Sequence, residues 1–473
     1  MTSKQRWILV LASMASFMVA LDALVVATAL TTIRSDLNAS LETLEWTMNS
    51  YNLSFAVLLM TGAALGDRFG RRRVFMIGLG IFSVSSAACA LSPNVAALIT
   101  FRTLQGVGAA IILPLALTLI SAGFSPERRG KALGLFSGVT GLATLSGPFI
   151  GGVVAEGLAW QWIFWINIPI GIAAMLLVLV RIDESHGPNN RLDIGGLVLV
   201  TIGTLALVWG LVRGNTLGWS SPEISIALAG GLVFVIAFVG WERRAAAPML
   251  PMRFFRVRAF TTANTANFCL YASLYGTLFL LAQYLQTALH HGPLGAGLRL
   301  MPWTATLMVC APIAGALADR VGERRFMVGG LLLQTIGMGW LAAIATAETS
   351  YAQMVVPLIV SGCGISMGMP AAQKSVVGAV AVREVGQASG AITTLRIFGG
   401  VFGIAVLSAV FAARGGYESA QTFADGFAAA MAGAAIAAFV GAAIALGMPG
   451  RKKSPNAAAA PAPVAAVPVE ATD

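Results

Sequence analysis

The sequence predicts an all-α polytopic membrane protein with fourteen transmembrane helices, arranged as two six-helix halves with two extra helices between them. The 473 residues are 57% hydrophobic and only 11% charged, whereas soluble proteins carry about 25% charged residues. Fourteen apolar segments are long enough, or nearly long enough, to cross a bilayer. A short charged motif also occurs twice in the chain. Composition, segment length and repetition therefore indicate the same architecture.

The apolar segments follow one another through short connections. A helix rises about 1.5 Å per residue, so about 20 apolar residues cross the hydrocarbon core. No connection is long enough to hold a soluble catalytic domain. The expected spans are 7–31, 46–66, 74–92, 95–121, 131–156, 162–180, 193–213, 224–242, 259–287, 295–318, 326–346, 353–372, 386–412 and 426–448.

The repeated motif sets the expected domain boundaries. Residues 66–73 read GDRFGRRR and residues 318–325 read ADRVGERR, and each copy follows the second span of a six-span block. Parallel halves around a central site are typical of one class of secondary transporters. The terminal segment is rich in Ala and Pro and has little to bury, so we expect it to be disordered. The expected units are an N-terminal half at 1–181, two inserted helices at 182–258, a C-terminal half at 259–448 and a cytoplasmic tail at 449–473.

The distribution of basic residues predicts the side of the membrane that each loop faces. With the N-terminus inside, 24 of the 30 Lys and Arg residues fall in inner segments and four in outer segments. This positive-inside bias places both termini in the cytoplasm. Because the basic residues form short clusters between apolar runs, the net charge of +10 indicates topology rather than nucleic-acid binding. The N-terminus leads directly into a full-length span, so we expect a retained first helix rather than a cleaved signal peptide.

The residue pattern does not favour an enzyme or a metal site. The four cysteines lie inside apolar runs without metal-ligand spacing. No nucleophile–base set is visible, and Gly130-Lys131 is followed by Ala132 rather than by the hydroxyl residue of a phosphate-binding loop. We therefore expect no catalytic residue, no metal and no cofactor. Transport energy would come from an ion gradient or from the gradient of the substrate itself.

Asp22 is the one charge in the first apolar span. A carboxylate inside a membrane costs at least a few kcal/mol unless it finds a partner, water or a proton. By helix rise, Asp22 lies about 13 Å and Arg102 about 10 Å below the same outer surface. We expect an ion pair that limits the cost of burying both charges. It would act as a protonation switch, in which a cationic or polar substrate could compete for the carboxylate; a permanent structural pair is the alternative.

The repeated loops resemble the signature of the major facilitator superfamily, Gly-x-x-x-Asp-Arg-x-Gly-Arg-Arg. The first copy has Ala63 where the leading glycine is usual, with Gly62 one residue early. The second copy keeps Gly315 and has Glu323 in place of an arginine.

Two further spans carry motifs that resemble those of the same superfamily. Residues 98–110, LITFRTLQGVGAA, resemble its proton-coupling helix and contain Arg102. The fifth span resembles the antiporter motif of the superfamily at Gly147, Pro148, Gly151 and Gly152. Small residues also let membrane helices pack closely, so packing is an alternative reason for these glycines.

Other segments resemble the 14-span drug:proton antiporter branch, the EmrB/QacA-type multidrug exporters. They are LDALVV at 21–26, WQWIFWINIPIG at 160–171, YLQ at 284–286 and RIFGG at 396–400, where Gln161 replaces an expected arginine. The resemblance implies a proton-coupled exporter of small amphipathic drug-like or antibiotic compounds in the bacterial inner membrane. It would function as a monomer that transports protons and a small-molecule substrate. We expect it to contact membrane lipids and not to bind nucleic acid. A dedicated metabolite or lipid exporter, an uncoupled facilitator and a non-transporting scaffold are the alternatives.

The resemblance also implies a cytoplasmic latch in the repeated loops. Asp67 would face the positive N-terminus of the helix that begins near 384–386, and the arginines would reach carboxylates such as Glu127. Topology and lipid head-group binding are the alternative reasons for the arginines. The expected latch residues are Asp67, Arg68, Gly70, Arg71, Arg72, Asp319 and Arg320.

Polar residues inside the spans are candidates for a substrate cavity. Asn264, Asn267 and Tyr271 recur at helical spacing and share one face. Arg396 lies within its span without an obvious carboxylate partner in the C-terminal half. Hydrogen bonds between helices are the alternative reason for such residues. The cavity candidates are Asn49, Asn52, Gln105, Asn264, Asn267, Tyr271, Gln283 and Arg396.

Overall fold

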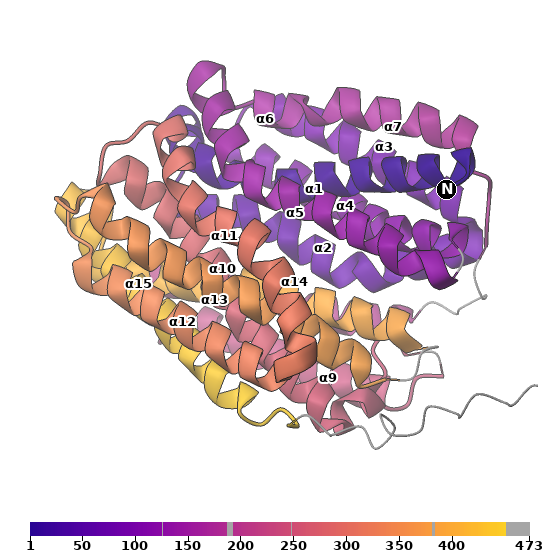
Figure 1. Ribbon diagram of the computed structural model, residues 1–473. Helices are drawn as coiled ribbons and strands as arrows, with labels where there is room; N and C mark the ends of the chain where they lie inside the picture. The colour runs from indigo at the N-terminus through magenta and orange to yellow at the C-terminus, as the bar shows by residue number, and fades with distance from the viewer. Residues whose placement is uncertain (125, 187–192, 247, 381–383, 451–473) are drawn as a thin grey trace, which may run out of the picture.

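The computed structural model describes residues 1–124, 126–186, 193–246, 248–380 and 384–450 (Figure 1). Within these ranges every regular element is a helix. All but the first two residues of the expected tail, 451–473, lie outside the described residues. The all-α class predicted from composition is therefore confirmed for the part of the chain that is described.

The N-terminal half comprises seven labelled helices, two of which share one expected span. They are α1 (Ser3–Leu37), α2 (Leu41–Phe69), α3 (Arg71–Ala90), α4 (Val95–Gly123), α5 (Pro126–Gly157), α6 (Trp162–Trp165) and α7 (Asn167–Arg181). The inserted segment contains α8 (Ile194–Leu217), α9 (Pro222–Glu242) and the short 3₁₀ helix η1 (Met252–Arg256). The C-terminal half comprises α10 (Arg258–Thr287), α11 (Pro293–Val321), α12 (Glu323–Ile344), α13 (Tyr351–Gly378), α14 (Val385–Arg414) and α15 (Ala420–Ala445).

Twelve helices in the described residues are long and apolar enough to cross a membrane. The helices α2 and α5 are not among these twelve, although they contain 29 and 32 residues. Each lies where the sequence predicts a span. The chain is therefore a multi-pass, all-helical membrane protein.

Polar caps account for the starts of many helices. Helix α1 begins after Thr2, whose side chain accepts a hydrogen bond from the Gln5 backbone in a capping box. Ser40 and Asn94 accept equivalent hydrogen bonds at the starts of α2 and α4, as does Ser419 at the start of α15. Such caps satisfy backbone N–H groups that have no partner within the helix.

The two copies of the charged motif adopt the same backbone geometry. Gly70 joins α2 to α3 with φ = +103°, and Gly322 joins α11 to α12 with φ = +100°. A side chain is strained at such values, and glycine is not. The internal repeat read from the sequence is therefore also a repeat of local structure.

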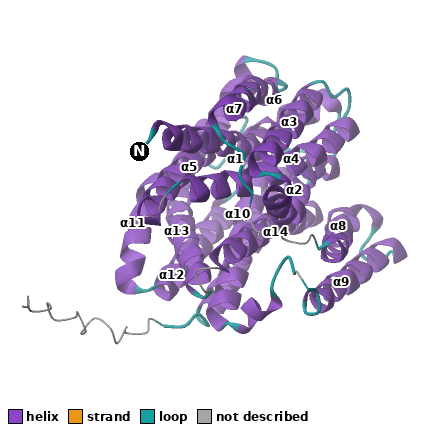
Figure 2. Ribbon diagram, turned by 90° about the vertical axis from the view of Figure 1, so that its right-hand side faces the viewer, coloured by secondary structure: helices purple, strands orange, loops and turns teal. Residues whose placement is uncertain are grey.

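The helices form two bundles that lie side by side, with the N-terminal half above the C-terminal half in Figure 1. The bundles meet where α5 packs on α11, α14 on α2, and α1 on α10. The hairpin of α8 and α9 stands at the edge, beside α14 and α2 (Figure 2). Its two helices are the least buried of the twelve apolar helices. The hairpin is thus peripheral to the place where the halves meet.

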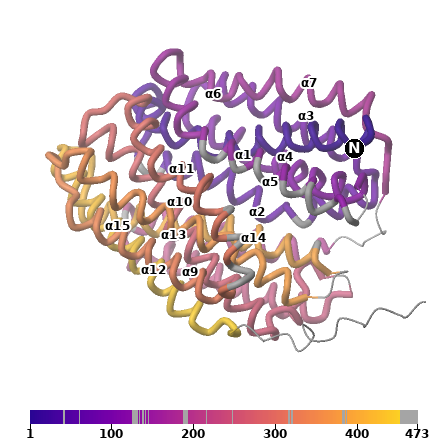
Figure 3. Tube along the Cα trace, viewed as in Figure 1, coloured from indigo at the N-terminus to yellow at the C-terminus, as the bar shows by residue number. Residues whose placement is uncertain are grey.

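The two ends of the bundle differ in how closely the halves approach. We call the end where α1 begins the near face, and the opposite end the far face (Figure 3). Buried residues of α1 from Leu24 to Ile33 belong to the same apolar core as α10 and α15. This part of α1 lies toward the far face, so the core of the C-terminal half extends into the N-terminal half there.

Candidate functional site: a buried carboxylate cluster

Asp22 and Arg102 form an ion pair inside the N-terminal half. Arg102 Nη1 donates to Asp22 Oδ2 at 2.5 Å, and the side chains of Asp22 and Arg102 are 0% and 1% exposed. They come from α1 and α4, which pack against each other. The contact expected from their similar depth is therefore present. Each charge offsets the cost of burying the other.

Two amides complete the surroundings of the Asp22 carboxylate. Gln105 Nε2 donates to Asp22 Oδ1 at 2.9 Å, and Asn167 Nδ2 donates to the same oxygen at 2.8 Å. Ser86 Oγ on α3 accepts hydrogen bonds from both amides and donates to the Phe164 carbonyl oxygen. Helices α1, α3, α4 and α7 therefore meet at one buried carboxylate.

Arg102 has further partners besides Asp22. Its Nη1 donates to Gln105 Oε1 at 2.8 Å, and its Nε donates to the Thr47 carbonyl oxygen at 3.2 Å. The guanidinium lies 4.2 Å from the centroid of the Tyr51 ring, which favours a cation. Tyr51 in turn donates to the Val19 carbonyl oxygen on α1. The arginine therefore connects α4 to both α1 and α2.

This geometry limits what can bind Asp22. Both of its oxygens accept hydrogen bonds from protein groups, and the side chain is inaccessible. A substrate cation has no open face of the carboxylate to contact in this conformation. Direct competition between a cation and Arg102, which the sequence suggested, is therefore not supported by the structure. Binding of a proton requires at least one of these donors to turn away, because a protonated carboxyl donates a hydrogen bond.

The glycines of α5 place this helix against both halves. A methyl group at Gly151 would lie 2.4 Å from the Val25 carbonyl oxygen on α1, one turn beyond Asp22. A methyl group at Gly152 would lie 2.5 Å from the Pro293 carbonyl oxygen on α11. The absence of a side chain at these positions thus lets α5 approach α1 on one side and α11 on the other.

Polar contacts join the two halves at the far face. Gln286 of α10 donates to the Thr28 carbonyl oxygen at 3.0 Å and also bonds to Thr31, both on α1. Glu156 at the end of α5 accepts a hydrogen bond from the Leu294 backbone at 2.9 Å. These contacts hold the far-face ends of α1 and α5 against the C-terminal half.

A cation–π contact also crosses between the halves at the far face. The Arg34 guanidinium lies 3.4 Å from the centroid of the Tyr417 ring, in the loop between α14 and α15. Burial raises the pKa of the Tyr417 phenol, and the Arg34 charge opposes that rise. The phenol therefore stays neutral and presents its ring to the guanidinium.

The charged loop between α2 and α3 has different partners from those expected. Asp67 pairs with Arg71, one turn further along the chain, at 2.8 Å. Glu184, beyond α7, accepts hydrogen bonds from the backbone of Arg72 at 2.9 Å and of Arg73 at 3.2 Å. The loop is thus anchored within the N-terminal half. The expected contact of Asp67 with the start of α14 stays a prediction, because residues 381–383 before that helix lie outside the described residues. The Arg68 side chain is exposed.

Several expected latch residues cannot be placed from their side chains. The side chains of Glu127, Asp319 and Arg320 lie outside the described part of the chain.

At the near face, Lys4 pairs with Asp183, and the lysine lowers the pKa of that carboxyl. This exposed pair connects the start of α1 to the segment after α7.

The cavity candidates fall into two groups. Gln105 belongs to the Asp22 cluster, and Gln283 accepts from Tyr417 and donates within its own helix, so neither is free for a ligand. Four of the remaining candidates keep polar side-chain atoms without a hydrogen-bond partner in the protein. They are Asn49 and Asn52 on α2 and Asn264 and Asn267 on α10. The other two, Tyr271 on α10 and Arg396 on α14, contact each other.

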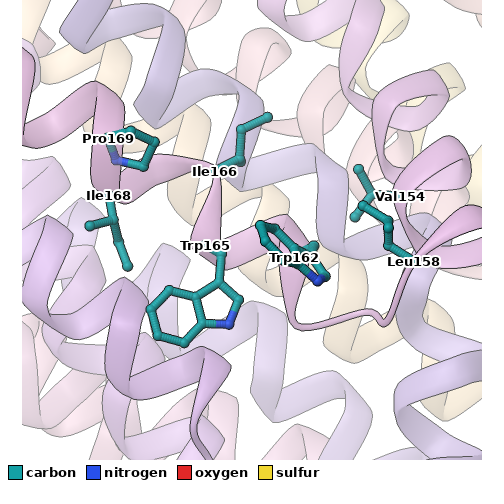
Figure 4. A pocket seen from close by; sticks show the side chains of 7 residues that line it. All are labelled: Val154, Leu158, Trp162, Trp165, Ile166, Ile168 and Pro169. Carbon is teal, nitrogen blue, oxygen red and sulfur yellow. The ribbon is translucent and has the colours of Figure 1, made fainter.

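An apolar pocket of about 420 Å³ lies at the far-face end of α5 and the start of α7 (Figure 4). No charged side chain lines it. Two of its residues, Ile166 and Ile168, flank Asn167 in the sequence, while Asn167 itself bonds to Asp22. The pocket is therefore a neighbour of the carboxylate cluster and not part of it. Its lining residues are Val154, Leu158, Trp162, Trp165, Ile166, Ile168 and Pro169.

Sequence reasoning did not assign Asn167, Ser86 or Glu184 to a site. Asn167 was visible as an uncharged polar residue in an apolar run, and such residues bond to a neighbouring helix. Ser86 and Glu184 carried no comparable signal, because their partners come from helices that are distant in the sequence.

Comparison with known proteins agrees with this architecture. The chain is 32% identical over 415 residues to the multidrug resistance protein Stp of Mycobacterium tuberculosis, covering 87% of this chain and 77% of that protein. It is 34% identical over 401 residues to the tetracenomycin C resistance and export protein of Streptomyces glaucescens, covering 84% and 74%. It is 35% identical over 417 residues to the cephamycin export protein CmcT of Amycolatopsis lactamdurans, covering 86% and 85%.

Solved structures show the same fold. A bacterial homolog of the human lysosomal transporter Spinster, in an inward-facing and unoccupied conformation, superposes with a TM-score of 0.69 at 15% identity. The match covers 95% of this chain and 98% of that chain. The profile of the Major Facilitator Superfamily matches residues 12–261 and 263–471. The chain is therefore a membrane transporter, not an enzyme, and it belongs to the Major Facilitator Superfamily.

Proposed function

We propose that this protein is a proton-coupled exporter of small amphipathic, drug-like compounds, working by alternating access in the bacterial inner membrane. Its relatives are named for multidrug resistance and for resistance to or export of antibiotics, which supports a drug as substrate. Fourteen transmembrane helices, with α2 and α5 added to the twelve apolar helices, would place both termini in the cytoplasm. The near face would then be the inner side of the membrane.

The carboxylate cluster is the observation that carries the proton-coupling proposal. Asp22 is a buried acid on α1, its partners come from α4 and α7, and Ser86 of α3 bonds to the two amides among them. When a proton neutralises Asp22, Arg102 loses its counter-charge and the cluster must rearrange. Helix α1 also packs on α5 through Gly151, and α5 packs on α11 of the other half through Gly152. A change in the cluster can therefore alter how the halves meet.

The contacts at the far face support a stepwise cycle. With the far face closed by Gln286 and Glu156, substrate would enter from the near face. Opening of the far face requires these contacts to break, and return requires them to form again. We propose that Asp22 is protonated when the transporter returns to the conformation with a closed far face. The proton gradient would then drive each cycle of export. No nucleotide is needed in this cycle.

A growth assay tests the function. A drug-sensitive bacterium expressing the protein is exposed to a panel of amphipathic antibiotics, beside cells that express Asp22→Asn at the same level. The proposal predicts raised minimum inhibitory concentrations for some compounds with the wild type and none with the variant. Equal protection by both proteins would contradict proton coupling through Asp22, and no protection by either would contradict drug export.

Export of one dedicated compound is the second candidate function. Three relatives are named for a single compound: tetracenomycin C, cephamycin or methylenomycin A. The same panel separates the two: a dedicated exporter protects against one chemical class only.

A further inference from the structure

Arg396 is a deep cation without a paired carboxylate among the described residues. It is the twelfth residue of α14, about 17 Å along the helix from its start. Its guanidinium lies 5.5 Å from the centroid of the Tyr271 ring on α10. The side chain is partly exposed in spite of this depth. A charge at such a place in a membrane helix is costly and is retained where it faces water, a partner or a ligand.

The face of α10 beside Arg396 carries polar atoms that no protein group satisfies. Asn264, Asn267 and Tyr271 follow one another at spacings of three and four, so they share a helix face. Asn264 and Asn267 are 1% and 2% exposed, yet Asn264 Oδ1 and Asn267 Nδ2 have no hydrogen-bond partner in the protein. Buried polar atoms without partners are costly, so a polar group that enters this region would gain hydrogen bonds from them.

Helix α14, which carries Arg396, packs against both α10 and α2. Tyr275 of α10, one turn beyond Tyr271, packs against Gly400 of α14. Both amide atoms of Asn49 on α2 are buried and lack a partner. Helix α14 thus lies between α10 of its own half and α2 of the N-terminal half, near the centre of the molecule (Figure 2). The residues shown beside Arg396 itself are those of α10.

The balance of charge decides which ligand fits. Asp22 and Arg102 neutralise each other, and both Asp22 oxygens are already bonded. The unbalanced charge near the centre of the described helices is therefore the positive charge of Arg396. A cationic ligand would add a second positive charge beside it, whereas an anionic ligand would supply the missing counter-charge. The guanidinium fork also matches the two oxygens of a carboxylate.

We propose that the exported compounds are amphipathic organic anions, typified by aromatic carboxylates, with the anionic group at Arg396. The ring system would lie against Tyr271 and Tyr275, and Asn264 and Asn267 would bond to polar substituents. This inference rests on the proposed function, because it names the substrate class of that transporter. An anionic substrate differs from the cationic substrate that the deep carboxylate Asp22 suggested.

A matched pair of fluorescent probes tests the inference. Anthracene-carboxylate and aminomethyl-anthracene share one ring system and carry opposite charges. Their binding to the purified protein in nanodiscs is measured by fluorescence anisotropy, with empty nanodiscs subtracted. The wild type should bind the carboxylate about tenfold or more tightly than the amine. Arg396→Gln should remove that preference, and Arg396→Lys should keep part of it because the charge is retained.

Arg414→Gln is the matched control, since it makes the same change on an exposed residue at the end of the same helix. It should bind both probes as the wild type does. If Arg396→Gln fails to fold, the preference of the wild type and of Arg396→Lys still decides. A wild type that binds the amine as tightly as the carboxylate, or binds neither probe, overturns the inference.

Uptake into inverted membrane vesicles separates this inference from the proposed function. If a pH gradient drives uptake of the amine but not of the carboxylate, the exporter is real and the inference is wrong. If neither probe accumulates while purified protein still prefers the carboxylate through Arg396, the binding inference stands and proton-driven export is wrong.

Discussion

Arg102 Nη1 lies 2.5 Å from Asp22 Oδ2, and Asn167 Nδ2 lies 2.8 Å from the other oxygen of the same carboxylate. One acid therefore joins α1 to α4 through a charge and to α7 through an amide. A change in the charge of Asp22 acts on both contacts together.

Asn167→Ala should destabilise the protein and slow transport. The substitution removes one donor from the buried carboxylate and one from Ser86. A hydrogen bond to a charged group contributes about 1.5–3 kcal/mol, so a clear drop in the thermal unfolding temperature is expected. Differential scanning fluorimetry in detergent measures it. Gln387→Ala, which removes an exposed amide from α14, should leave the unfolding temperature unchanged. Equal effects of the two substitutions would argue against a role for Asn167 in the cluster.

Gly152→Ala should weaken closure of the far face. The added methyl group would lie 2.5 Å from the Pro293 carbonyl oxygen and 2.8 Å from Leu294 Cα, both backbone atoms that cannot move aside cheaply. The halves should therefore spend more time apart at that face. Labelling of a cysteine introduced at Thr28 with a membrane-impermeant maleimide on intact cells reports this opening.

Gly157→Ala is the control for that experiment. It lies on the same helix, and an added methyl group there would meet nothing within 4 Å. It should label at the rate of the parent protein. Unchanged labelling in Gly152→Ala as well would show that the close approach of α5 to α11 does not limit opening.

Glu184→Gln should loosen the charged loop between α2 and α3. The carboxylate accepts hydrogen bonds from the backbone of Arg72 and Arg73 at the start of α3, where an anion is favoured by the helix dipole. Loss of such a cap costs about 0.5–2 kcal/mol. Glu348→Gln, an exposed acid at the far face, serves as the control. Proteolysis of the loop in inverted vesicles should be faster in Glu184→Gln alone; equal rates in both variants would contradict the capping role.

The helices and the repeat could be predicted from local sequence. Apolar length defines a span, and the motif copies at Gly70 and Gly322 share a backbone conformation that favours glycine. The pair of Asp22 and Arg102 also followed from simple geometry, because two opposite charges at equal depth in neighbouring helices reduce each other's burial cost.

Partners that depend on packing could not be predicted in this way. Glu184 caps the loop after α2 although more than a hundred residues separate them. Asp67 was expected to face the N-terminus of α14, and the pair that it forms with Arg71, one turn further along, was not anticipated. Gln105 was assigned to a cavity because its helix face was unknown, and it lies in the carboxylate cluster instead. In each case the missing information was which helix lies beside which.

The most direct test of the account is substrate uptake by inverted vesicles that contain wild type or Asp22→Asn at equal amounts. The isosteric amide keeps the size of the side chain and removes its titratable charge. The account predicts that an imposed pH gradient drives uptake by the wild type, that a protonophore abolishes it, and that Asp22→Asn shows no gradient-driven uptake while still exchanging substrate. Gradient-driven uptake by Asp22→Asn at the wild-type rate would contradict the account.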